Sequence, residues 1–84
     1  MAIQLQIPDS VAQALRVPEE RIEQELLREL AVSLYERGFL SFGKGRELAG
    51  LGKYEFGRFL AARGVSRHYG PEEFEDDLAY ARGE

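Results

Sequence analysis

The sequence contains no cysteine, no tryptophan and a single histidine, His68. Without cysteine, the chain can form neither a disulfide framework nor a cysteine-ligated zinc site. One histidine excludes a multi-histidine metal site within one chain. No apolar run approaches the ~20 residues that a membrane-spanning helix needs, and no signal-peptide core follows Met1. We therefore expect a soluble, cytoplasmic protein.

Catalytic patterns are missing as well. The sequence has no phosphate-binding loop and no Ser/His/Asp arrangement at an informative spacing. Acidic residues near the C-terminus lack a histidine partner, and acids at a helix start usually complement the helix dipole. We expect neither an enzyme nor a bound cofactor or metal.

The chain is short and moderately apolar. It has 84 residues, of which 44% are hydrophobic, so it is too apolar to be wholly disordered. Its length allows one domain, and a monomer of this size buries little apolar surface. We therefore expect a small folded domain that dimerises.

The net charge of −4 is unevenly distributed along the chain. Residues 1–36 hold three basic against seven acidic residues, a net charge of −4. Residues 37–70 hold seven basic against two acidic residues, a net charge of +5. Residues 71–84 hold one basic against six acidic residues, a net charge of −5. Such asymmetry indicates separate partners for the segments or a contact between them.

The N-terminal residues 2–7 alternate apolar and polar side chains. This period of two predicts a short strand with Ile3, Leu5 and Ile7 on one face, ended by Pro8. One strand alone is unstable. Its partner is either a second short strand at residues 65–69 or the same strand in another copy of the chain.

Two helices are predicted to follow this strand. Ser10 and Gln13 fit a capping box for a short helix that ends at Leu15. A longer helix is predicted to begin at Pro18 and to stop at Gly38. Its apolar stripe consists of Leu26, Leu27, Leu30, Ala31 and Leu34.

Val32 falls outside that stripe and forms a second apolar edge that would suit a partner chain. We therefore expect dimer contacts from the strand and this helix, at Ile3, Leu5, Ile7, Leu27 and Val32.

The basic segment is predicted to contain two short helices around Ala49-Gly50-Leu51, the first capped by Ser41. The spacing resembles a DNA-binding helix-turn-helix, in which apolar residues lock the second helix onto the first. Leu48, Phe56, Phe59 and Leu60 supply that lock. The candidate DNA-contacting residues are Lys44, Arg46, Lys53, Tyr54, Gly57 and Arg58. The alternative is a helical hairpin whose basic side chains are simply solvated.

A family resemblance rests on four segments in particular: ELLRELAV at 25–32, LYERG at 34–38, LSFGK at 40–44 and ELAGL at 47–51. Through these, the chain resembles the UPF0175 family of small prokaryotic proteins over nearly its whole length. The family is regarded as antitoxins of type II toxin–antitoxin pairs, similar to VapB antitoxins. The resemblance implies a PIN-domain ribonuclease toxin as partner. The sequence departs from the expected pattern at Arg46, Gly52 and Gly57.

The resemblance implies a dimer that binds operator DNA and neutralises a toxin. The acidic tail is the candidate toxin-binding arm, with apolar anchors at Phe74, Leu78 and Tyr80 and a rim of Glu72, Glu73, Asp76 and Asp77. The tail can equally be a solvated helix packed on its own domain, or it can fold over the basic segment.

Two further alternatives concern function. In a ribbon-helix-helix arrangement, paired strands would present Gln4 and Gln6 to DNA. Without a toxin, the chain would be a stand-alone transcriptional regulator or a small dimeric protein-interaction adaptor.

The expected fold class is mostly α. It comprises a short strand, a long helix, a helix-turn-helix, a second short strand and an acidic C-terminal helix or tail. The expected organisation is residues 1–38 for dimerisation, 39–70 for the basic segment and 71–84 for the arm.

Overall fold

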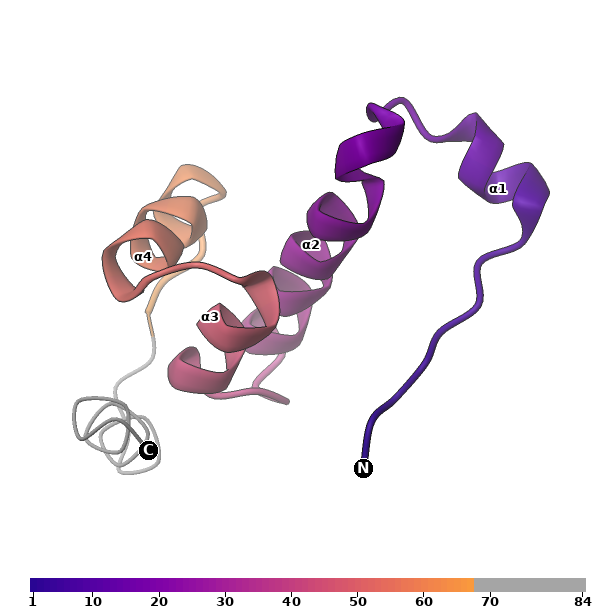
Figure 1. The fold of residues 1–84 in the computed structure, drawn as a ribbon. Coiled ribbons are helices and arrows are strands. Elements are labelled where there is room, and N and C mark those ends of the chain that lie inside the picture. The colour runs from indigo at the N-terminus through magenta and orange to yellow at the C-terminus, as the bar shows by residue number, and fades with distance from the viewer. Residues whose placement is uncertain (68–84) are drawn as a thin grey trace.

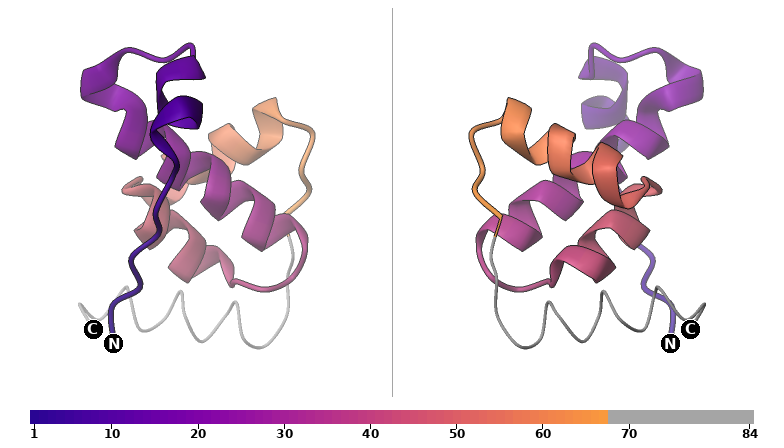
Figure 2. Two further views of the ribbon diagram at one scale, coloured as in Figure 1. Left: turned by 90° about the vertical axis from the view of Figure 1, so that its right-hand side faces the viewer. Right: turned by 90° about the vertical axis from the view of Figure 1, so that its left-hand side faces the viewer.

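The structure is a computed structural model that describes residues 1–67, and helices dominate it (Figure 1). The elements are α1 (Asp9–Ala14), a 3-10 helix η1 (Glu19–Arg21), α2 (Ile22–Glu36), α3 (Phe42–Ala49) and α4 (Lys53–Ala62). In Figures 1 and 2, α2 lies between the N-terminal segment on one side and α3 with α4 on the other. The mostly helical class is confirmed, and the predicted C-terminal helix or tail lies outside the described residues.

The turns around α3 follow the sequence pattern closely. Gly38 ends the turn after α2 with a φ of +80°, a conformation that favours glycine. The Ser41 hydroxyl accepts a hydrogen bond from the Lys44 backbone N–H at 3.2 Å, so Ser41 caps α3 as predicted. Gly50 follows α3 in the left-handed conformation, with a φ of +68°. The break between the two short helices is therefore where the sequence predicted it.

The starts of α1 and α2 differ from the prediction. Pro8 occupies the N-cap of α1, and no side chain caps that helix, so the predicted Ser10 capping box is wrong. Pro18 is likewise the N-cap of η1, and the α-helix proper begins only at Ile22. In both places the fixed φ of proline determines the boundary more strongly than the side-chain cap does.

Neither predicted strand forms within residues 1–67. The chain is extended over residues 2–7, but their backbone groups have no hydrogen-bonded partner within the described residues. Residues 65–67 have no regular structure, because the Val65 N–H donates to the carbonyl of Leu60 at 3.0 Å and closes a turn after α4. His68 and Tyr69 lie outside the described residues.

Three aromatic rings, one from each of α2, α3 and α4, form the centre of the core. The ring centroids of Tyr35 and Phe42 are 6.0 Å apart, those of Tyr35 and Phe56 6.1 Å, and those of Phe42 and Phe56 5.2 Å. All three side chains are fully buried. Around them lie four smaller buried residues: Ala31, Val32, Ala49 and Leu60.

The buried face of α2 is not the leucine stripe that the sequence predicted. Val32 is only 5% exposed and belongs to the core, so its predicted place at a dimer edge is wrong. It shares a face with Tyr35, three residues later, and that face packs on α3. Of the predicted stripe, Ala31 is buried, but Leu26, Leu30 and Leu34 are only half-buried and Leu27 is exposed.

Two glycines inside helices provide a matched test of this packing. A Cβ on Gly45 would lie 3.0 and 3.1 Å from two atoms of the Phe56 ring, whereas a Cβ on Gly57 would meet nothing within 4 Å. Alanine is favoured over glycine in a helix by about 1 kcal/mol.

We expect Gly57→Ala to raise the melting temperature by about 4–8 °C, the shift that ~1 kcal/mol gives in a domain of this size. Gly45→Ala should lower it, because the buried Phe56 ring has no room to retreat. Thermal unfolding followed by circular dichroism measures both variants. Stabilisation by Gly45→Ala would contradict the close contact between α3 and α4.

Candidate nucleic-acid interface

The position of α4 is set by its contact with α3. Phe56 and Leu60 turn into the core, and Phe56 lies against the bare backbone of Gly45. Gly45 is the small residue at the point where α3 and α4 meet. The sequence pattern treats this glycine only as a weak point of the helix, because its partner Phe56 lies eleven residues away.

Two arginines fasten the helices to α2 from outside the core. The Arg63 guanidinium, just past α4, forms an ion pair with Glu29 of α2 and lies 3.8 Å from the centroid of the Phe59 ring. The Arg28 Nε donates to the carbonyl of Ala49, the last residue of α3, at 3.3 Å. Together these contacts hold the C-terminal ends of α3 and α4 against α2.

The outward face of α4 carries three of the predicted DNA-contacting residues. Lys53, Tyr54 and Arg58 are exposed, and Tyr54 is 85% exposed. Gly57 lies between them, half-buried, with open space where a side chain would be. The first turn also contains Glu55, whose carboxylate accepts the Gly52 N–H at 3.1 Å and so caps the helix.

Arg46 does not lie on this face. Its side chain is 7% exposed, and its Nη1 lies 3.5 Å from the carbonyl oxygen of Leu51, to which it donates. The Leu51 N–H in turn donates to the Arg46 carbonyl at 3.0 Å. Arg46 therefore braces the turn between α3 and α4, and its predicted place among the DNA-facing residues is wrong.

Lys44 is exposed but on α3. Its Nζ lies 3.5 Å from a carboxylate oxygen of Glu47, one helical turn later. An exposed pair of this kind contributes little to stability and is readily exchanged for another partner.

The charge count of +5 overstates what the basic segment offers to a ligand. Arg46 and Arg63 serve the contacts above, and the Arg67 guanidinium lies 3.8 Å from the centroid of the Phe42 ring. Aromatic residues at 42 and 59 are the sequence features that could have predicted such stacking, since arginine packs well on aromatic faces. Which arginine reaches which ring depends on the tertiary fold.

The other predicted sites separate into two groups. Ile3, Leu5, Ile7 and Leu27 are exposed apolar side chains, as a dimer contact requires. All seven predicted toxin-binding residues, from Glu72 to Tyr80, lie outside the described residues.

Within residues 1–67, no group of three or more His, Cys, Asp or Glu side chains is placed to hold a metal ion. No helix in that range is both long and apolar enough to cross a membrane.

Comparison with known proteins places the chain in a family. The model of UPF0175, described as an uncharacterised protein family, matches residues 1–83. The chain belongs to the UPF0175 family. A UPF0175 protein of Aeropyrum pernix is 44% identical over 72 residues, which cover 86% of this chain and 81% of the relative. The predicted family membership is thus confirmed.

Other UPF0175 proteins are similar over most of their length. The relative from Archaeoglobus fulgidus is 34% identical over 76 residues, covering 90% of this chain and 85% of its own. The relative from Synechocystis is 30% identical over 80 residues, covering 95% of this chain and 85% of its own. No solved structure matches the chain.

Replacing Arg46 and Lys44 separately should distinguish a bracing side chain from a surface one. We expect Arg46→Ala to lower the free energy of unfolding by about 1–3 kcal/mol, because it removes buried contacts and leaves the Leu51 carbonyl without this donor. Lys44→Ala should change it by less than ~0.5 kcal/mol. Urea unfolding measures both values, and equal values for the two variants would contradict the bracing role.

Proposed function

We propose that this UPF0175 protein binds DNA through the exposed face of α4 and regulates transcription as the antitoxin of a type II toxin–antitoxin pair. The observation that carries the DNA-binding half is the outward placement of Lys53, Tyr54 and Arg58 on a helix fixed from behind. α3 and α4, joined by a glycine turn, have the element order of a helix-turn-helix, in which the second helix enters the major groove.

The first turn of α4 is suited to phosphate. The N-terminus of a helix carries a partial positive charge that attracts anions, and in α4 the Glu55 carboxylate at the Gly52 N–H offsets part of it. Lys53 adds a formal charge there, and the Tyr54 hydroxyl can donate to a phosphate oxygen. Arg58, one turn further along, is placed to reach base edges, where arginine pairs with guanine.

Gly57 leaves a gap on the exposed face of α4, because it has no side chain. No part of residues 1–67 fills the space above it. Without a side chain at this point, a DNA backbone can approach α4 closely between Tyr54 and Arg58. One copy offers few contacts, so we propose that two copies bind a palindromic operator with their α4 helices about 34–36 Å apart.

The DNA-binding half is tested by a double substitution. Lys53→Ala/Arg58→Ala should weaken binding to the chain's own promoter about tenfold and make the slope of log affinity against log salt shallower by about 2. Fluorescence anisotropy over a salt series measures both quantities. The matched control is Arg16→Ala/Arg21→Ala, which removes the same charge from exposed positions away from α4.

An equal loss in the control would mean that overall charge, and not α4, drives binding. If the unchanged protein ignores its promoter at low salt, with and without its partner, the regulator proposal is wrong. The chain would then be an interaction adaptor, a function that its exposed apolar N-terminus would suit.

The toxin half of the proposal rests on family resemblance and charge. The sequence of residues 71–84 has a net charge of −5, and nucleases bind RNA in basic grooves. We propose that this segment occupies the groove of a PIN-domain ribonuclease, with apolar anchors at Phe74, Leu78 and Tyr80.

The toxin half predicts that Phe74→Ser/Leu78→Ser abolishes neutralisation of a PIN-domain ribonuclease encoded beside this chain, because the apolar anchors are lost. Promoter binding should not change. Growth of cells that express both proteins is the readout, and Glu84→Gln at the end of the chain is the control. Full protection by the double variant, or the absence of such a neighbouring gene, would refute this half.

A further inference from the structure

The N-terminal arm, residues 2–7, has no partner within the described part of the chain. Its apolar side chains are exposed: Ile3 by 78%, Leu5 by 71% and Ile7 by 43%. Its backbone N–H and C=O groups make no hydrogen bonds within residues 1–67. An extended segment with open backbone groups and one apolar side is the usual template for pairing with another strand.

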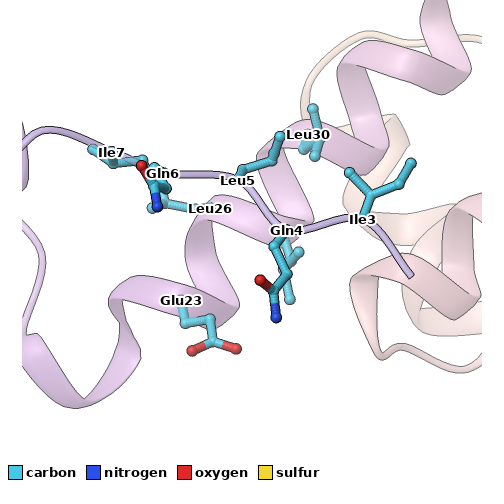
Figure 3. Close-up of a pocket in the computed structure, with 9 residues that line it drawn as sticks. Ile3, Gln4, Leu5, Gln6, Ile7, Glu23, Leu26 and Leu30 are labelled. Carbon is cyan, nitrogen blue, oxygen red and sulfur yellow. The ribbon is translucent and has the colours of Figure 1, made fainter. Parts of the chain in front are cut away.

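A groove separates the arm from α2. It has a volume of about 660 Å³ and is lined by the arm residues Ile3, Leu5 and Ile7 on one side and by Leu26, Leu27 and Leu30 of α2 on the other, with Gln4, Gln6 and Glu23 as its polar lining residues (Figure 3). In Figure 3, the side chains of Ile3 and Leu5 leave one side of the arm, and that of Gln4 leaves the opposite side. The walls of the groove are mostly aliphatic and open to water. This is unfavourable unless another apolar surface covers it.

We propose that a second copy of this chain covers the groove, with the two arms paired as antiparallel strands about Leu5. The sequence of the arm favours a second copy of the chain as the partner. Residues 3–7 read Ile-Gln-Leu-Gln-Ile, which is the same in both directions. Antiparallel pairing centred on Leu5 therefore places isoleucine opposite isoleucine, glutamine opposite glutamine and leucine opposite leucine.

Symmetry favours the antiparallel arrangement over a parallel one. Two identical chains in a closed dimer are related by a two-fold axis. An axis normal to the ribbon between the two Leu5 residues makes the strands antiparallel and keeps both apolar faces on the same side. A two-fold axis that makes the strands parallel would place the two apolar faces on opposite sides. Only the antiparallel pair presents six aliphatic side chains together to the α2 leucines.

Charge does not oppose the pairing of the two arms themselves, and the ionisable side chain in the groove is Glu23 of α2. Residues 2–8 contain no ionisable side chain, and the first charged side chain is that of Asp9. Two arms can therefore approach without like-charge repulsion. A two-stranded ribbon alone is marginally stable, so the apolar faces of the two α2 helices must contribute to the dimer. Val32, buried in the core of its own chain, takes no part.

This inference deepens the proposed function, because the dimer would bring two α4 helices to one operator. Its test uses no DNA, so its failure and the failure of DNA binding are separable. Sedimentation equilibrium of the full chain should show a dimer. Leu5→Lys should raise its dissociation constant at least tenfold, since two like charges would meet on the two-fold axis.

The matched control for this variant is Phe39→Lys. Phe39 is also 71% exposed, and it lies in the turn after α2, away from the arm. Its replacement should leave the dimer unchanged. Because Leu5 is exposed in the single chain, Leu5→Lys should keep the helical circular dichroism spectrum of the parent.

Strand direction is tested by Ile3→Lys/Ile7→Glu in one chain. In the antiparallel pair each new ammonium faces a new carboxylate of the other copy, so the double variant should dimerise better than Ile3→Lys alone. In a parallel pair like charges would meet, and the double variant would dimerise worse.

The lack of cysteine makes a direct test possible. Leu5→Cys should form a disulfide-linked dimer on oxidation, because directly opposed Cβ atoms in such a ribbon lie about 4.5–5.5 Å apart. Phe39→Cys should cross-link far more slowly. A monomer at all concentrations, a dimer unaffected by Leu5→Lys, or equal cross-linking of the two cysteine variants would overturn the proposal.

Discussion

The mutual contact of Tyr35, Phe42 and Phe56 is the interaction on which the arrangement of the helices depends. Each ring comes from a different helix, and each of the three pairs has its centroids 5.2–6.1 Å apart. Tilted and edge-to-face pairs contribute about 0.5–1.5 kcal/mol beyond the area they bury. In a domain with so few buried side chains, this contact fixes α3 and α4 on α2 and thereby directs the outer face of α4 to solvent.

Several arginines complete the fold around this aromatic centre. Arginines 28, 46, 63 and 67 lie around the margin of the α2–α4 unit, where they reach backbone carbonyls, a carboxylate or aromatic faces. Their long apolar stems cover surface that a core this small cannot bury. The cations that remain on the outward face of α4 are Lys53 and Arg58. Cationic side chains thus complete the fold around α2 and also lie exposed on α4.

Helix caps and helix breaks were predictable from the sequence, but the contacts between helices were not. The Ser41 cap, the Gly38 and Gly50 breaks and the two helices around them follow from short-range chemistry. The buried face of α2 could not be predicted, because it is selected by rings on α3 and α4 that the helix period alone does not reveal. Arg46 was misplaced for the same reason, since its acceptor exists only once the turn has formed. The strand at residues 2–7 was predicted as an element, but a strand requires a partner that residues 1–67 do not contain.

The arm is joined to the α2–α4 unit only through α1 and the four residues 15–18, which have no regular structure. α1 buries no residue of its own. In a dimer whose paired arms also pack on both α2 helices, α1 and residues 15–18 would therefore form a connection fixed at one end by the ribbon and at the other by α2. The distance between the two α4 helices would then be set by how the ribbon packs on α2, and not by the conformation of residues 15–18.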